Sequence, residues 1–173
     1  MISDGVSSLG TKNMNENITI SGKIRITKYK AGLKEILWQS PWMNNLVVNN
    51  SSRGRNLIVQ RLIGTNTYSL NILYGEIGTS TGSPTAQDVG LGTPTVRVVT
   101  ALASIGTGLN EAQLQFFFTD AQLPTGTYTE FGTFVDGTAA TASGQLFNHI
   151  LFSTAYAKAA GEDTTVEVDF TVS

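Results

Sequence analysis

Residues 75–97 read GEIGTSTGSPTAQDVGLGTPTVR and interrupt a series of β-strand patterns. The stretch holds five of the 18 glycines and two of the four prolines. Because glycine adopts backbone angles that other residues avoid and proline lacks an N–H donor, we expect neither a regular helix nor a central strand here. Val89, Leu91 and Val96 are apolar residues within this segment. They predict a long loop that is held against the body of the protein.

The chain before this loop has the pattern of a β-hairpin. Apolar and polar residues alternate from Asn17 to Thr27, which predicts a strand with one buried and one solvated face. A turn at Ala31 and Gly32 leads to a second strand, so residues 17–40 form the expected hairpin.

Trp38 and Trp42 follow on either side of Pro41. Both indoles suit a place in the core, and the alternative is that one of them covers a contact between subunits, where tryptophan is enriched. The two tryptophans are therefore the candidate interface residues.

One short helix is expected between the hairpin and the loop. Ser51 or Ser52 can cap its start, and Gly64 can end it. Its apolar stripe consists of Leu57, Ile58, Leu62 and Ile63. A helix of about ten residues is not stable alone, so we expect the stripe to pack on a sheet.

Strand patterns follow the loop at a spacing of about ten residues, with glycine, proline, asparagine or aspartate between them. They cover residues 94–104, 112–119, 127–135, 144–154 and 164–172. This pattern predicts a mainly β protein, an antiparallel β-sandwich or a barrel-like domain with one short helix. Residues 17–173 form that single domain, and residues 1–16, which are poor in large apolar groups, are expected to be a flexible N-terminal arm.

Composition excludes several classes of site. The chain has no cysteine, so disulfides and thiolate metal sites are excluded, and His149 is its only histidine. No apolar run is long enough to span a membrane, and the N-terminal sequence lacks the order of a signal peptide.

Charge is distributed unevenly along the chain. Residues 1–61 carry nine basic and three acidic residues, whereas residues 62–173 carry two basic and ten acidic ones. This split predicts head-to-tail docking between copies of the chain. We do not expect a nucleic-acid partner, because the basic residues are not interleaved with exposed aromatics.

The sequence contains no convincing catalytic pattern. His149 lies in a strand pattern, and the G-x-S-x-G sequence at residues 78–82 lies in the irregular loop and not at the strand-to-helix turn of a nucleophile elbow. We therefore expect an ordinary structural histidine. Asp120, Glu130 and Asp136 lie near strand ends, where carboxylates are common in turns. The glycine-rich loop lacks the Lys-Ser/Thr pair of a phosphate-binding loop. We therefore expect no enzyme activity, no cofactor, no metal and no small-molecule substrate.

Three stretches of the sequence form a recognisable combination. The first runs from Gly75-x-x-Gly78 through Pro84, Asp88 and Leu91 to Arg97. The second covers residues 128–134, and the third leads from residues 144–147 to Lys158. Together they resemble virion structural proteins of tailed bacteriophages, although the usual first spacing of that family is G-x-G. The resemblance spans about residues 44–172 and leaves the hairpin and the arm outside it.

This resemblance implies a non-enzymatic component of the phage particle, assembled in the cytoplasm of the bacterial host. Its expected partners are copies of itself and other virion proteins. A tail position, as a fibre, baseplate or adaptor element, is the first expectation. The alternatives are a capsid-decorating cement protein and a glycan-binding module on the phage surface. On this view residues 17–40 are an assembly hairpin added to the family-like domain.

The residues of the resembling stretches receive structural roles. They are Gly78, Pro84, Asp88, Leu91, Arg97, Glu130 and Gly132. Pro84 presets a turn, Asp88 can accept backbone N–H bonds within the loop, and Leu91 can anchor the loop in the core. Arg97 is expected to pair with Glu130 across adjacent strands. The two glycines are expected to use positive φ or to allow a close approach of strands.

Overall fold

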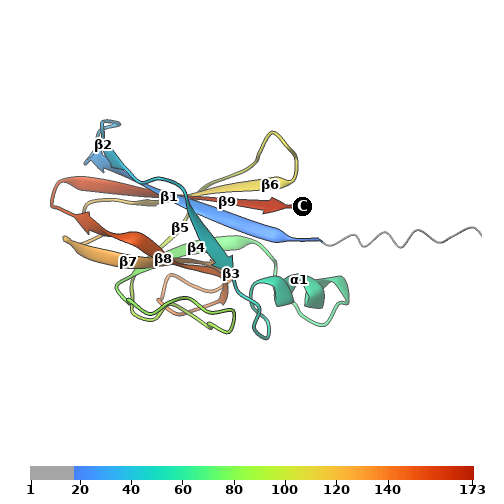
Figure 1. The fold of residues 1–173 in the computed structure, drawn as a ribbon. Coiled ribbons are helices and arrows are strands. Elements are labelled where there is room, and N and C mark those ends of the chain that lie inside the picture. Colours follow the sequence, from blue (N-terminus) through green and yellow to red (C-terminus); the bar gives the residue numbers. More distant parts are fainter. Residues whose placement is uncertain (1–17) are drawn as a thin grey trace, which may run out of the picture.

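A computed structural model describes residues 18–173, so the predicted arm lies outside the described residues. The elements are β1 (Ile20–Lys30), β2 (Ile36–Gln39), β3 (Met43–Val47), α1 (Arg55–Leu62), β4 (Ile72–Gly78), β5 (Pro94–Ile105), β6 (Glu111–Phe118), β7 (Gly126–Val135), β8 (Gln145–Lys158) and β9 (Glu162–Val172). Figure 1 shows the strands gathered into one body with α1 near the end of β3. No helix in this part of the chain is long and apolar enough to cross a membrane.

The strands close into an antiparallel barrel. They follow the order β1-β3-β8-β7-β4-β5-β6-β9, and β9 returns to β1. β1 and β9 pair along their whole length, from Ile20 opposite Val172 to Lys30 opposite Glu162. β2 and β3 pair with the same edge of β1. β3 pairs with residues 22–24 of that edge, and β2 pairs with residues 27–29. The prediction of a mainly β antiparallel fold with one short helix is confirmed, and of the two architectures considered the barrel is the one that forms.

The expected hairpin forms, but β1 is a strand of the barrel and not an appendage to it. Three ion pairs join β1 to β9: Lys23–Asp169 (3.6 Å), Arg25–Glu167 (2.7 Å) and Lys28–Glu162 (3.0 Å). The basic and acidic halves of the sequence therefore meet within one chain. This internal pairing involves three of the nine basic residues of the first 61, and the head-to-tail docking of copies stays a prediction.

The barrel interior is filled by alternate residues of the strands. The largest fully buried core side chains include Ile24, Ile26, Ile77, Phe116, Phe118, Phe131 and Tyr156. The rings of Phe116 and Phe131 lie 5.6 Å apart, centroid to centroid. Gly75 of β4 lies beneath them, and a Cβ there would come within 2.6 Å of Phe116. The absence of a side chain at this position thus lets two aromatic rings fill the centre of the barrel.

The helix differs from its prediction at its start and on its apolar face. It begins at Arg55 after Gly54, without a side-chain cap, so neither Ser51 nor Ser52 caps it. Leu57 is buried, whereas Leu62 is 81% exposed and Ile63 is also exposed. The helix lies at an end of the barrel, where only its first turns reach the core. Gly64 follows the helix with a φ of 69°, as expected of a residue that ends one.

The placement of both tryptophans in the core is wrong. Trp38 is 41% exposed and stacks on Tyr156 at 5.9 Å. Trp42 is 38% exposed and lies over the guanidinium of Arg25 at 4.6 Å. Proline at position 41 separates β2 from β3, and both indoles cover polar or aromatic neighbours instead of entering the interior.

The irregular segment is shorter than predicted. β4 continues to Gly78 and β5 begins at Pro94, so only residues 79–93 form the loop. Proline is tolerated at position 94 because it is the first residue of its strand.

Candidate functional site

The loop of residues 79–93 joins β4 to β5 and lies against the outside of the barrel, as the green segment of Figure 1. The backbone N–H of Asn49 donates to the carbonyl of Ala86 at 2.8 Å. The hydroxyl of Thr129, on β7, donates to the carbonyl of Ser80 at 2.6 Å. The loop is therefore tied both to the segment after β3 and to the outer face of β7.

Glu130 of β7 is the main anchor of this loop. Its buried carboxylate accepts four hydrogen bonds: Oε1 from the N–H groups of Ser80 (3.0 Å) and Thr93 (2.8 Å), and Oε2 from the N–H of Gly92 (2.9 Å) and from His149 Nε2 (3.0 Å). Each carboxylate oxygen thus has two partners, which uses the acceptor capacity of the group. Three of the four partners belong to the two ends of the loop, so Glu130 holds both ends at once.

His149 of β8 joins Glu130 to the loop's own carboxylate. Its Nδ1 lies 2.7 Å from Asp88 Oδ2, and the residue is buried. Both ring nitrogens can donate to carboxylates only when the imidazole is protonated. Burial lowers the pKa of His149, but the hydrogen bonds to Glu130 and Asp88 outweigh burial and raise its pKa above the ordinary 6.5. We refer to Asp88, His149 and Glu130 as the carboxylate–histidine cluster.

The two carboxylates of this cluster remain ionised. Burial raises the pKa of Glu130, but the hydrogen bonds from His149, Thr93, Gly92 and Ser80 outweigh it and lower the pKa to about 2. Burial acts in the same direction on Asp88, and bonds from Thr85 and His149 overcome it to give a lowered pKa. When His149 is protonated, the cluster therefore contains two anions around one cation, with every charge hydrogen-bonded.

Asp88 also organises the loop around the turn that follows Pro84. Its carboxylate accepts from the N–H of Thr85 at 2.9 Å and from the Thr85 hydroxyl at 2.6 Å. The N–H of Asp88 in turn donates to the carbonyl of Thr85 at 3.2 Å. The loop is thus folded by Asp88 and attached to the barrel by the same side chain, through His149.

Leu91 anchors the loop in a second, smaller apolar core outside the barrel. This core consists of Val48, Leu91, Phe134 and Leu146, with Tyr74 packed against it. Leu91 can approach because Gly132 lies below it: a Cβ at Gly132 would come within 3.0 Å of the Leu91 side chain and 2.8 Å of the Asn148 carbonyl. Leu91 therefore does not enter the barrel interior, and its core lies between the loop and the strands.

Gly78, like Gly132, leaves room for a close contact, in this case with the side chain of Glu130. A Cβ at Gly78 would lie 2.5 Å from both Glu130 Oε1 and the carbonyl of Thr93. The sequence predicted that Gly78 and Gly132 either use positive φ or allow a close approach. Neither has positive φ, so glycine is needed at these positions for the close approach alone.

The predicted pair of Arg97 and Glu130 is wrong. Arg97 Nη1 faces Glu76 Oε2 at 4.0 Å, and both side chains are fully buried. The guanidinium lies between the rings of Tyr74 (4.6 Å) and Phe134 (4.4 Å). The register explains the error, because Arg97 is directly opposite Glu76, whereas Glu130 lies one strand further away. Burial raises the pKa of Glu76 and lowers that of Arg97.

Sequence reasoning missed Glu76 and the two partners of His149. Glu76 could have been found, since strand parity places it on the same face as Gly78. The contact of Glu130 with His149 follows from the pairing of Gly132 with His149, and the contact of Asp88 follows from how the loop folds back. No local sequence pattern reveals either.

The other candidate carboxylates have separate local roles. Asp120 accepts from Lys158 Nζ at 2.6 Å, and Asp136 accepts from the N–H of Ser69 at 3.1 Å. The structure therefore does not join Asp120, Glu130 and Asp136 into one site. Within residues 18–173, no group of three histidine, cysteine or acidic residues is arranged to hold a metal ion.

Comparison of the chain with protein-family models, curated sequences and solved structures gives no match. The functional argument therefore depends on the chain's own residues. Their arrangement can stabilise the shape of a surface loop, because the ionisable groups of the cluster are bonded to one another and to the loop backbone.

Proposed function

We propose that this protein is a non-enzymatic structural component of a tailed-phage virion, with a tail-associated place as the first assignment and capsid decoration as the alternative. The residues that resemble the phage family support the proposal, because their contacts are mechanical. Asp88, Glu130, Leu91 and Gly132 all hold one outer loop against the barrel.

The saturation of Glu130 carries this proposal. A general base or a nucleophile needs a lone pair that can reach a substrate. Both oxygens of Glu130 accept two internal bonds each, and His149 uses both ring nitrogens. The carboxylate–histidine cluster is thus suited to preserving shape, which is what an assembly subunit requires.

Exposed apolar side chains give independent support. They occur on the β1–β2 hairpin, on α1 and on the β5–β6 turn, and include Leu33, Ile36, Leu37, Leu62, Ile63, Ile105 and Leu109. Grouped apolar residues on the surface of a small protein mark places where other molecules bind. A subunit that contacts several neighbours would carry such groups on more than one side.

Glycan binding is a second candidate because of Trp38. The exposed indole lines a depression of about 350 Å³ with polar Lys28, Thr154 and Glu162. An aromatic surface with a polar rim is the usual form of a small-ligand site. Binding on a glycan array that is lost in Trp38→Ala would favour this candidate.

Particle analysis tests the structural proposal. Phage particles purified from a lysate should contain the protein in a fixed copy number by quantitative mass spectrometry. A cryo-EM map should then show the barrel in the tail, or on the capsid if the alternative applies. Recovery of the protein only in the particle-free fraction would contradict the proposal.

A further inference from the structure

The loop of residues 79–93 is attached to the barrel in two ways that differ in chemistry. Its two ends are held by Glu130 through three backbone N–H groups. These bonds need only an ionised carboxylate, and the pKa of Glu130, about 2, keeps it ionised throughout the range in which a histidine titrates. The middle of the loop, residues 84–90, is attached by Asp88 through His149. We refer to residues 84–90 as the strap, and its attachment depends on the protonation of that histidine.

Loss of a proton from His149 must break one of its two contacts. The neutral imidazole carries one N–H, so it can donate to Asp88 or to Glu130 but not to both. The side chain of Glu130 is fully buried, whereas that of Asp88 is 21% exposed. Water can therefore solvate a released Asp88 carboxylate, but it does not reach Glu130. The remaining proton consequently stays on Nε2 facing Glu130, and the contact with Asp88 is the one that is lost.

The other bonds of the strap do not replace this contact. Three donors from the segment before α1 reach strap carbonyls: Asn49 N–H to Ala86 (2.8 Å), Asn50 Nδ2 to Gln87 (2.7 Å) and Arg53 Nε to Val89 (3.2 Å). The bonds of Asn50 and Arg53 lie at the exposed surface, where water competes for both partners and the net contribution is small. The contact of Asp88 with protonated His149 joins two charged groups, so it contributes more than these bonds.

The charges around His149 determine the direction of the effect. Among the described residues, two charged groups face the ring at hydrogen-bond distance, Asp88 from the loop and Glu130 from β7. β3, which pairs with β8 at His149, contains no charged residue. Glu76 of the next strand, β4, is paired with Arg97. Both groups that face the ring are carboxylates and favour its charged form, so protonation closes the strap and deprotonation opens it.

We propose that residues 84–90 are a pH-controlled strap, which protonated His149 holds against the barrel and neutral His149 releases at Asp88. Both ends of the loop stay bonded to Glu130 in either state, so the middle of the loop moves between two fixed points. Release brings the Asp88 carboxylate into water and uncovers Nδ1 of the ring. This inference goes beyond the proposed function, because it concerns a movement of the loop and holds wherever the protein is located.

The protonation of His149 can be followed directly, because it is the only histidine of the chain. Nitrogen NMR of the full chain, labelled at histidine, should show both ring nitrogens protonated in acid. The titration midpoint should lie above 6.5, and the neutral ring should carry its proton on Nε2. A neutral ring with its proton on Nδ1 would overturn the proposal, because Asp88 would then keep its contact.

Amide hydrogen exchange on both sides of that midpoint tests the movement. The N–H of Asn49 donates to Ala86 of the strap, so its protection should fall by about tenfold or more when His149 is neutral. This comparison is made after correction for the pH dependence of chemical exchange. The N–H groups at the loop ends, which Glu130 holds, should keep their protection.

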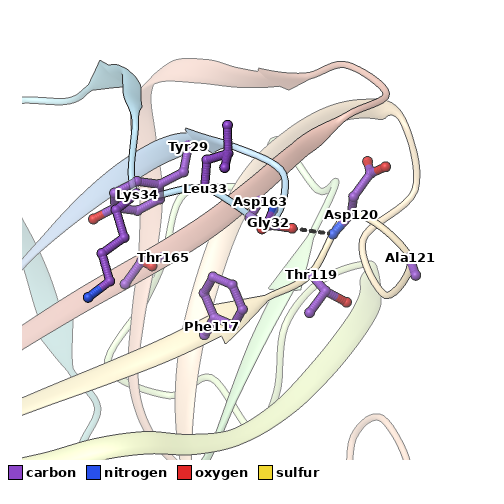
Figure 2. Close-up of a pocket in the computed structure, with 10 residues that line it drawn as sticks. All are labelled: Tyr29, Gly32, Leu33, Lys34, Phe117, Thr119, Asp120, Ala121, Asp163 and Thr165. Atoms are coloured by element: carbon purple, nitrogen blue, oxygen red, sulfur yellow. Dashed lines mark hydrogen bonds between the residues drawn. The ribbon is translucent and has the colours of Figure 1, made fainter.

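Asp163 supplies an internal control for the exchange measurement. Its carboxylate accepts from the N–H groups of Gly32 at 2.8 Å and of Asp120 at 2.7 Å, and Figure 2 shows it between them. These bonds also join backbone N–H groups to a carboxylate, but no histidine takes part in them. The protection of both amides should therefore stay unchanged as His149 titrates.

Two variants and a control separate the switch from a loss of structure. The asparagine of Asp88→Asn can donate from its Nδ2 to the neutral ring, so protection of Asn49 should persist when His149 is neutral. The glutamine of His149→Gln has no proton to lose and can still donate to Glu130, so protection of Asn49 should be low at every pH. Asp136→Asn, the same substitution at a carboxylate after β7, should switch as the wild type does.

Two further results would overturn the proposal. One is protection of Asn49 that does not change as His149 loses its proton. The other is an equal loss of protection at Asn49 and at the loop ends, because the whole loop would then open and Glu130 would not hold its ends.

Discussion

Replacement of Glu130 by glutamine tests the anchor of the outer loop with almost no change of shape. The glutamine carbonyl oxygen can accept two of the backbone bonds, but its amide group cannot accept from Gly92 or from protonated His149 as the carboxylate does. Each orphaned buried N–H costs about 1–3 kcal/mol. The two retained bonds lose their charged acceptor, at about 1 kcal/mol each. We therefore expect Glu130→Gln to lower the free energy of unfolding by about 4–8 kcal/mol.

Urea unfolding at about pH 6, where the histidine is charged, measures this loss. Hydrogen exchange should locate it, with faster exchange of the amides of Ser80, Gly92 and Thr93. Glu35→Gln, at an exposed carboxylate, is the matched control and should change stability by less than about 0.5 kcal/mol. A Glu130→Gln protein as stable as the control, with protected loop amides, would refute the anchoring role.

Three further predictions follow from the outer face of the barrel. The raised pKa of His149 stabilises the folded protein fully below about pH 6.5, and this contribution is lost as pH rises through the native pKa. Urea midpoints should therefore fall as pH rises above about 6.5, and His149→Gln should flatten the fall. Arg97→Ala should cost about 3–5 kcal/mol, because it leaves Glu76 buried without its cation, and a double-mutant cycle should find coupling of Arg97 to Glu76 but not to Glu130. Gly132→Ala should cost about 1–3 kcal/mol by overpacking against Leu91, whereas Gly90→Ala, with open space around it, should be neutral or slightly stabilising by thermal denaturation.

Most strands could be predicted from the sequence because alternation is a local signal. The strand of residues 164–172 expected from its valines and Phe170 corresponds to β9, which begins two residues earlier. Barrel closure could not be predicted, because it depends on β1 meeting β9, and no local pattern records that pairing. The exposed face of α1 was missed for a related reason: periodicity identifies an apolar stripe but does not say how much of it reaches a core.

The sequence identified the residues of the candidate site better than it identified their contacts. The glycines, Asp88 and Leu91 were singled out as residues that shape the loop, and each lies at the loop or directly beneath it. The pairing of Arg97 was assigned to the wrong carboxylate, because the choice between Glu76 and Glu130 requires the register of three strands. His149 was predicted to be an ordinary structural histidine. Its contact with Asp88 was missed, because the approach of Asp88 depends on how the loop folds back.

The pairing of β1 with β9 also determines when the chain can fold. More than 130 residues separate Lys30 from its partner Glu162, so the barrel depends on a contact of very long range in the sequence. Folds of this kind form slowly, because the entropy of closing a long loop is lost before the contact is gained. At a synthesis rate of about 5–20 residues per second, β1 waits roughly 7–30 s on the ribosome before β9 exists. During that interval β2 and β3 can pair with one edge of β1, but the edge that receives β9 is open to other chains. Efficient folding in the cell therefore depends on protection of this edge until synthesis reaches β9.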